Sequence, residues 1–125
     1  MILGIGMDMV DIARVERAAA RYGERFFRRM FTLKELEHCF RKKCFGDSLA
    51  ARVAVKEAAF KALGCGWTEC GGFTSVEVVS ETGGRPAVLF HGKAARLAEE
   101  CGAGRAHVAI THEAGFAAAV VVLER

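Results

Sequence analysis

The sequence predicts an α+β domain in which an antiparallel sheet carries helices on one of its faces. Three observations predict this class. Alternating apolar segments separated by short turns, which are typical of antiparallel strands, dominate the C-terminal half. Helical periodicity and capping signals dominate residues 12–64. A chain of 125 residues, 52% hydrophobic and 26% charged, is globular and has room for one core, so we expect residues 1–125 to form a single domain.

A strand and three short helical segments are expected at the N-terminal end. The apolar run MILGIGMDM predicts the strand. Asp11 can cap the first helix, which Gly23 then ends. A short helical turn follows in ERFFRRMF, and Thr32 with Glu35 forms a T-x-x-E capping box at the start of the next helix. The expected ranges are 1–9, 12–22, 24–31 and 33–41.

A long central helix is expected from Asp47 or Ser48 to Gly64, after a basic loop at residues 42–47. At about 100° per residue, one side of this helix is a continuous arc of small apolar residues that can pack closely against another element. The other side mixes charges with Val53 and Phe60, which predicts the half-buried wall of a cleft. The small arc consists of Ala51, Ala54, Val55, Ala58, Ala59 and Ala62, and the charges are Arg52, Lys56, Glu57 and Lys61.

The C-terminal half is expected to contain four strands and one helix. TSVEVVS and AVLFH read as a hairpin around the turn ETGGRP, and two final strands flank the turn HEAG. The expected strands are 74–80, 87–91, 105–111 and 116–124, and the helix is 93–101. The complete predicted order is β-α-α-α-β-β-α-β-β.

Charge and composition limit the possible partners. The net charge of +3 is too small to indicate nucleic acid, but residues 14–43 are basic, which favours an acidic partner. The start lacks the features of a signal peptide, and FAAAVVVL is too short to cross a bilayer, so we expect no membrane partner and a cytoplasmic protein. Five cysteines without C-x-x-C spacing predict reduced thiols and no structural zinc.

Two carboxylates are the first candidates for chemistry. Asp8 is costly in an apolar strand unless it is paired or bound to a cation, although it could also face solvent or cap a turn. Together with Glu57 it could hold one Mg²⁺, with Lys61 as a phosphate partner. The simpler interpretation of Glu57 and Lys61, four residues apart, is an exposed ion pair along the helix.

A second candidate cluster lies in AITHE, where a strand is expected to end and turn. His112 there is either a turn histidine with no catalytic role, or a base or phosphate donor at the edge of the same cleft.

Five segments together closely resemble the small phosphopantetheinyl transferases of the holo-acyl-carrier-protein synthase family. The segments are GIGMDMVDIARVERA, FTLKEL, ARVAVKEAAFKALG, GGRP and HVAITHEAGFAAAVVVLER, and they extend the resemblance from about Gly4 to Glu124. The pairing of G-x-D near the start with K-E-A-x-x-K-A in a central helix is the most specific part. The resemblance implies transfer of 4′-phosphopantetheine from coenzyme A to a serine of acyl carrier protein, with release of adenosine 3′,5′-bisphosphate, as a step of fatty-acid biosynthesis.

The resemblance also implies residue roles. Asp8 and Glu57 are expected to bind Mg²⁺, Lys61 to contact the transferring phosphoryl group, and Arg52 to contact the 3′-phosphate of coenzyme A. Arg14 and Arg21 are expected to dock the acidic carrier. The other residues expected to contact coenzyme A are Gly64, Gly84, Arg85, Pro86, Thr111 and His112.

The assembly and two alternatives complete the predictions. FAAAVVVL lacks the alternation of polar and apolar residues expected of a strand with one face exposed to solvent. We therefore expect both faces of its sheet to be covered, in part by another subunit. The resemblance implies a homotrimer with active sites at the subunit boundaries. One alternative is a non-catalytic module whose basic helices bind an acidic protein or RNA. The other is a phosphohydrolase that uses the same metal pair.

Overall fold

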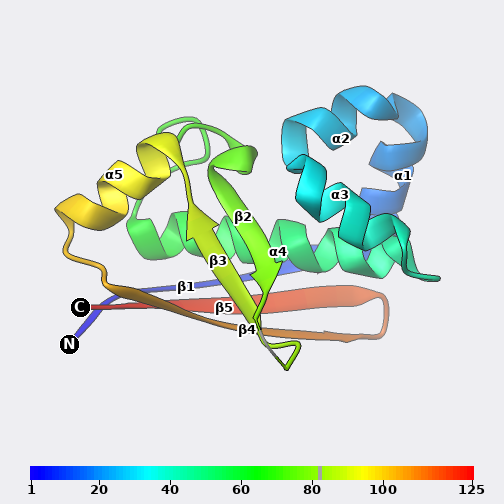
Figure 1. Cartoon of the computed structure of the whole chain (residues 1–125). Coiled ribbons are helices and arrows are strands. Elements are labelled where there is room, and N and C mark those ends of the chain that lie inside the picture. The colour runs from blue at the N-terminus through cyan, green and yellow to red at the C-terminus, as the bar shows by residue number, and fades with distance from the viewer. Residues whose placement is uncertain (82) are drawn as a thin grey trace.

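The computed structural model describes residues 1–81 and 83–125 (Figure 1). Its elements follow the predicted order, with one additional short 3₁₀ turn before the second strand. The strands are β1 (Ile2–Asp11), β2 (Val76–Ser80), β3 (Pro86–Phe90), β4 (Arg105–Glu113) and β5 (Phe116–Glu124). The helices are α1 (Ile12–Tyr22), α2 (Glu24–Met30), α3 (Leu33–Phe40), α4 (Phe45–Leu63), η1 (Phe73–Ser75) and α5 (Gly92–Glu100).

The strands form two antiparallel sheets. The larger has the order β1-β5-β4, and the smaller is the β2-β3 hairpin. Figure 1 shows α4 lying along one face of the larger sheet, with the hairpin and the other helices on the same side. The predicted α+β class, its antiparallel pairing and its element order are therefore confirmed, with the strands divided between two sheets.

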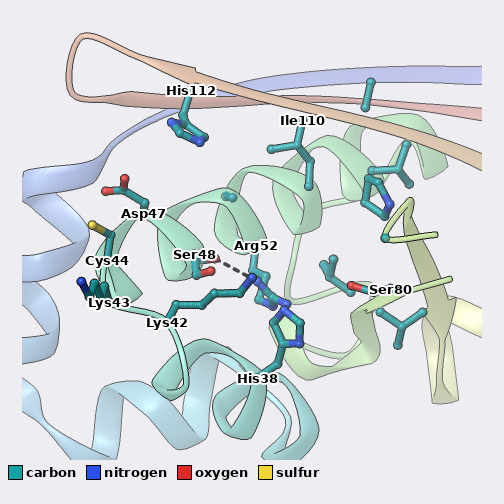
Figure 2. Close-up of a pocket in the computed structure, with 17 residues that line it drawn as sticks. His38, Lys42, Lys43, Cys44, Asp47, Ser48, Arg52, Ser80, Ile110 and His112 are labelled. Carbon is teal, nitrogen blue, oxygen red and sulfur yellow. Dashed lines mark hydrogen bonds between the residues drawn. The ribbon is translucent and has the colours of Figure 1, made fainter. Parts of the chain in front are cut away.

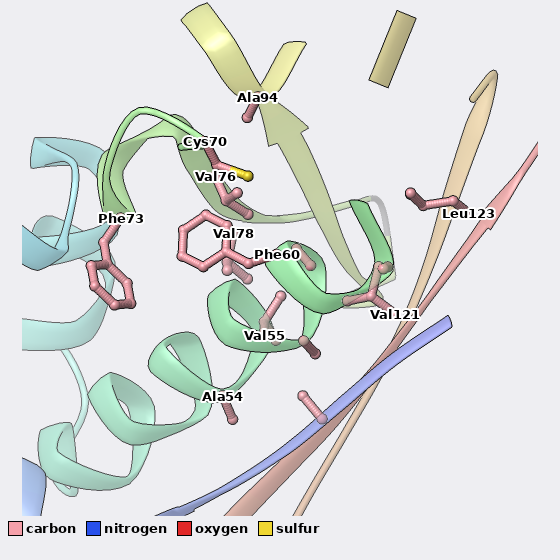
Figure 3. Packing of buried hydrophobic residues seen from close by; sticks show 14 residues of the cluster. Ala54, Val55, Phe60, Cys70, Phe73, Val76, Val78, Ala94, Val121 and Leu123 are labelled. Carbon is pink, nitrogen blue, oxygen red and sulfur yellow. The ribbon is translucent and has the colours of Figure 1, made fainter. Parts of the chain in front are cut away.

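The core lies between α4 and the larger sheet. All six residues of the predicted small arc on α4 are buried. They meet the inward positions of β5, which alternate along the strand as Ala117, Ala119, Val121 and Leu123. Figure 3 shows Val55 on α4 pointing toward the strand that carries Val121, with Phe60 directed toward the hairpin.

Strand β1 packs against α4 backbone to backbone. A Cβ atom at Gly6 would overlap the carbonyl oxygen of Ala58, and one at Gly4 would overlap that of Ala62. Two glycines on the strand and two alanines on the helix therefore permit an approach that larger residues would prevent. This contact brings Asp8 on β1 close to the C-terminal half of α4.

Most boundaries differ from prediction by one or two residues, and two of the differences affect the proposed site. Helix α4 begins at Phe45 after Cys44, which caps it without a side-chain hydrogen bond. Strand β4 continues to Glu113, because Ala114 and Gly115, with φ of 52° and 82°, make a two-residue hairpin turn. His112 therefore lies within a strand and not, as expected, in a turn.

Two residues of α4 do not face a cleft as predicted. Lys56 is completely buried and pairs with Glu35 of α3, donating additional hydrogen bonds to the carbonyl oxygens of Phe73 and Val76. Burial lowers the pKa of Lys56, while the charge of Glu35 raises it. Phe60 is also buried and packs edge-to-face on Phe73. The expectation that all four charges of α4 line a phosphate cleft is therefore wrong for Lys56, and the expectation that Phe60 walls it is wrong.

The cysteines differ from prediction at one pair. Cys65 and Cys70 form a disulfide across the loop after α4, with Cα atoms 6.2 Å apart, so the expectation of five free thiols is wrong there. Cys39 is a buried free thiol, whereas Cys44 and Cys101 are exposed free thiols. Within the described residues, no helix combines the length and apolar character that crossing a bilayer requires.

Candidate functional site

An acidic cluster with one lysine lies where β1 passes the C-terminal half of α4. The ammonium of Lys61 is 3.1 Å from a carboxylate oxygen of Asp8 and donates a 3.0 Å hydrogen bond to the carbonyl of Met7. Glu57, one turn earlier on α4, is half-buried beside them. The structure thus brings together Asp8, Glu57 and Lys61, the three residues predicted to carry the chemistry.

The charge of Glu57 is poorly compensated. Burial raises the pKa of its carboxyl group, and the neighbouring charge of Asp8 raises it further, while Lys61 lowers it. The exposed Glu57–Lys61 ion pair considered from the sequence is not among the ion pairs of the described residues, because Lys61 pairs with Asp8 instead. Two carboxylates that repel each other in this way favour a cation between them.

The cluster fits a magnesium ion with few protein ligands. Within residues 1–81 and 83–125, no group of three or more His, Cys, Asp or Glu converges on one point. Mg²⁺ is commonly held by one or two carboxylates, with water and substrate phosphate oxygens completing its octahedron. Asp8 and Glu57 would be those carboxylates.

A groove of 410 Å³ leads to the two carboxylates. It runs between β1, α1, α2 and α4, and Arg14 lines it together with Asp8 and Glu57. Val53 forms part of its wall, as predicted from the sequence. The remaining wall is mainly apolar, with Val15, Ala18, Phe26 and Met30.

A second, basic pocket of 850 Å³ lies on the other side of α4 (Figure 2). Arg52 is at its centre, only 8% exposed, and donates one hydrogen bond of 3.3 Å to the carbonyl of Ser48. The Nε of Arg52 is buried and has no hydrogen-bond partner. A buried guanidinium with an unused donor is suited to a charged acceptor such as a phosphate. The other polar residues that line the pocket are His38, Lys42, Lys43, Asp47, Ser48, Ser80 and His112.

His38 was not predicted from the sequence. Burial lowers the pKa of its imidazole, and the nearby charges of Arg52, Lys42 and Arg41 lower it further. An anion bound among these groups would oppose that effect and favour the protonated imidazole. In the sequence, the basic run RKK before α4 indicates such a pocket. The position of that run relative to Arg52 depends on the conformation of the loop, which the sequence does not show.

The remaining predicted site residues are dispersed. Gly84, Pro86 and His112 line the basic pocket with Arg52. Thr111 lies on the opposite face of β4, in a shallow apolar cavity with Met7 and Val120. Three others are exposed and line neither the groove nor the basic pocket: Arg21, whose guanidinium lies 5.4 Å from the centre of the Tyr22 ring, Gly64 at the end of α4, and Arg85 in the turn between Gly84 and Pro86.

The acidic cluster and the basic pocket lie at opposite edges of the larger sheet. Asp8 is on β1 and His112 is on β4, and β5 runs between these two strands. Helix α4 contributes to both places, with Glu57 facing the β1 side and Arg52 facing the β4 side.

Comparison with known proteins identifies the family. A model of the 4′-phosphopantetheinyl transferase superfamily matches residues 4–121. The chain is 44% identical to the holo-[acyl-carrier-protein] synthase of Koribacter versatilis over 126 aligned residues, covering 99% of both proteins. It is 42% identical to the enzyme of the same name from Geobacter sulfurreducens, covering 100% of this chain and 99% of that one.

Solved structures agree with this match. The crystal structure of holo-[acyl-carrier-protein] synthase from Neisseria meningitidis superposes with a TM-score of 0.91 at 30% identity, and both chains are fully covered. The Helicobacter pylori enzyme, solved in complex with coenzyme A, has a TM-score of 0.84 at 30% identity, covering 96% of this chain and 99% of that one. On its sequence and its fold, this chain belongs to the 4′-phosphopantetheinyl transferase superfamily.

Proposed function

We propose that this chain is a holo-acyl-carrier-protein synthase, which transfers 4′-phosphopantetheine from coenzyme A to a serine of apo-acyl carrier protein. The observation that carries the proposal is the convergence of Asp8, Glu57 and Lys61 at the end of a groove. Attack of a hydroxyl on a pyrophosphate requires in-line positioning and neutralised charge more than covalent catalysis. The charged groups of these three side chains could neutralise and position the pyrophosphate. We also propose that residues 1–125 act as one domain.

Each residue of the cluster has a distinct proposed role. Asp8 and Glu57 would hold Mg²⁺, which when bound neutralises charge on the pyrophosphate of coenzyme A. Lys61 would turn its ammonium from Asp8 toward the transferring phosphoryl group once that group arrives. A carboxylate of the pair can accept the proton of the attacking serine. Adenosine 3′,5′-bisphosphate would then leave.

The basic pocket is the proposed site of the nucleotide half of coenzyme A. Arg52, a buried guanidinium whose Nε has no partner in the protein, would bind the 3′-phosphate. His38 and Lys42 line the same pocket and would add to the positive field. The turn at Gly84, Arg85 and Pro86, with Gly64, Thr111 and His112, would complete the contacts to coenzyme A.

The carrier would dock on α1. Arg14 lines the groove that leads to Glu57, and Arg21 is exposed about two turns further along the same helix. Carrier recognition by these arginines fits the basic character of residues 14–43. We further propose a cytoplasmic role in fatty-acid biosynthesis.

A homotrimer is proposed from the outer face of the larger sheet. Ile5, Met7 and Met9 on β1 are 60%, 67% and 64% exposed, and they lie beside Val122, Val120 and Ala118 on β5. So wide an apolar face favours burial against a partner. In a closed ring, the β1 edge of one chain could meet the β4 edge of the next. The acidic cluster of one subunit would then complete a site with the basic pocket of its neighbour.

The assembly can be tested by mixing two defective chains. Asp8→Asn disables the acidic cluster, and Arg52→Met weakens the basic pocket, so the assay uses coenzyme A at a concentration well below the KM of the Arg52→Met variant. If one site uses both subunits, mixed rings regain part of the activity that either variant lacks alone. Sedimentation of the wild type as a fully active monomer at assay concentration would refute the trimer.

The reaction itself is tested with coenzyme A, Mg²⁺ and an apo-carrier, followed by intact mass of the carrier. A gain of one phosphopantetheine moiety is expected, together with release of adenosine 3′,5′-bisphosphate. A non-catalytic module binding acidic proteins or RNA would leave the carrier unmodified. A phosphohydrolase would release phosphate from the substrate and also leave the carrier unmodified. Either of these outcomes would refute the proposal.

A further inference from the structure

Cys44 is an exposed thiol in the wall of the basic pocket. It lies directly before α4, where its carbonyl accepts hydrogen bonds of 3.1 Å from the amide of Asp47 and 3.4 Å from that of Ser48. Figure 2 shows it with Lys42 and Lys43 on the loop that leads into the helix. The backbone that carries the thiol is therefore anchored at the rim of the basic pocket.

The pocket attracts negatively charged molecules independently of the thiol. Arg52 is more than nine-tenths buried there, and its Nε is directed at no acceptor of the protein. Lys42 and Lys43 are exposed at the rim, and Asp47 is the one carboxylate among the described residues that line the pocket. A cleft lined mainly by one sign of charge raises the local concentration of the opposite sign.

We propose that Cys44 is a modification site, at which the basic pocket selects small acidic disulfides for exchange. The thiolate of Cys44 attacks one sulfur of the disulfide. A new bond forms between the two sulfurs, the old sulfur–sulfur bond breaks, and the departing half leaves as a thiolate that takes up the proton released by Cys44. No other oxidant is required. The adduct places an acidic group beside Lys42, Lys43 and Arg52.

The adduct would occupy the space proposed for the nucleotide half of coenzyme A. This consequence rests on the proposed function, whereas the selective modification does not. A modified chain would lose affinity for coenzyme A, and reduction would restore it. Modification of Cys44 would therefore make the transferase activity depend on the ratio of disulfides to thiols in the surrounding solution.

The other free cysteines serve as controls within the same molecule. Cys101 is also exposed, but it follows α5 and does not line the basic pocket. Cys39 is buried, and burial raises the pKa of its thiol, so it should react only on unfolding. The Cys101 thiol donates a 3.2 Å hydrogen bond to the carbonyl of Ala98, so the influence of the pocket is measured by how the ratio of the two rates changes between disulfides of opposite charge.

The experiment treats the folded protein with glutathione disulfide, which is acidic, or with cystamine, which is cationic. Peptide mapping by mass spectrometry gives the modification rate at each cysteine. We expect glutathione disulfide to modify Cys44 about tenfold or more faster than Cys101, because electrostatic focusing changes encounter rates by about 10–10³. The preference should vanish with cystamine, weaken in high salt, and fall in Lys42→Gln and Lys43→Gln variants. Equal rates at the two cysteines, or the same preference with both reagents, would overturn the proposal.

The effect of Cys44 modification on transferase activity is measured in a separate assay. Each variant is compared with its own activity before treatment: glutathione disulfide should inhibit the wild type and a Cys101→Ser variant, whereas a Cys44→Ser variant should show the same activity with and without the reagent. Adenosine 3′,5′-bisphosphate should slow modification of Cys44 but not of Cys101. If the chain has no transferase activity, the mass measurement still decides whether Cys44 is the selected thiol. Selective modification without inhibition would overturn the link to the nucleotide pocket.

Discussion

The ammonium of Lys56 lies 2.8 Å from a carboxylate oxygen of Glu35, and neither side chain is exposed to solvent. Glu35 accepts two further hydrogen bonds, from the backbone amides of Thr32 and Val78. The pair thereby joins α4, α3 and β2 at one buried point. Lys56 precedes Glu57 in the chain, so the buried pair also fixes the helix that contributes Glu57 and Lys61 to the acidic cluster.

Replacing one partner of this pair should destabilise the fold strongly. Lys56→Met leaves the carboxylate of Glu35 buried without its cation, a change that typically costs about 3–5 kcal/mol. Urea unfolding followed by circular dichroism measures this loss. The matched control is Lys34→Met, because Lys34 is exposed on α3 and should change stability little. A Lys56→Met protein as stable as this control would contradict the assignment.

Metal binding should depend on the protonation of Glu57. Its pKa is raised above the usual value of 4.5, so in the metal-free protein the folded state keeps this proton to a higher pH than the unfolded chain does. That contribution to stability is present below 4.5 and is lost as pH rises through the raised pKa. Mg²⁺ requires the carboxylate, so its affinity should fall as pH is lowered toward the raised pKa.

Lys61 provides a test of this linkage. Lys61→Met removes a charge that lowers the pKa of Glu57, so the midpoint of the Mg²⁺ affinity profile should move to higher pH. Lys61→Arg keeps the charge and should leave the midpoint near that of the wild type. Titration calorimetry with Mg²⁺ alone, at several pH values, gives both profiles. Equal midpoints in the Met and Arg variants would argue against the linkage, and full metal affinity in Asp8→Asn with Glu57→Gln would refute the metal site.

Arg52 should distinguish coenzyme A from its analogue without the 3′-phosphate. Arg52→Met should raise the KM for coenzyme A by tenfold to a hundredfold, since hydrogen bonds to a charged group contribute about 1.5–3 kcal/mol. The KM for dephospho-coenzyme A should change little. Arg96→Met, on the exposed side of α5, is the control for loss of a positive charge. An equal effect on both substrates would exclude a role in binding the 3′-phosphate.

Docking of the carrier should depend on α1. Arg14→Glu or Arg21→Glu should raise the KM for the carrier and leave that for coenzyme A nearly unchanged. Added salt should weaken the wild type in the same direction, because exposed charges are screened within about 8 Å at physiological ionic strength. Arg105→Glu, at the far end of β4, supplies a charge reversal remote from α1. If the two KM values rose together, the arginines would not be docking residues.

Local signals in the sequence predicted most of the fold. The capping box at Thr32 and Glu35 is present with both of its hydrogen bonds, and Asp11 caps α1 through the amide of Ala13. Such signals depend on residues close in the chain, so they survive without tertiary information. The same holds for Gly64, which ends α4 in a left-handed conformation.

Contacts between distant segments could not be predicted in this way. The spacing on α4 places Lys56 among its charged residues, but only the packing of α3 and β2 shows that it is buried. Similarly, His38 lines the same pocket as Arg52 because α3 packs against α4. Helical periodicity gives the direction of a side chain and does not show which neighbour lies in that direction.

The contact of Gly4 and Gly6 with the carbonyl oxygens of Ala62 and Ala58 has a consequence for ion selectivity. It fixes the separation of the two backbones that carry Asp8 and Glu57, and with it the range of distances that their carboxylates can span. A limited range of carboxylate separations suits some ionic radii better than others. Mg²⁺ is small and requires a nearly ideal octahedral geometry. We therefore expect discrimination against larger ions such as Ca²⁺ to be encoded at two glycines that touch neither metal nor substrate.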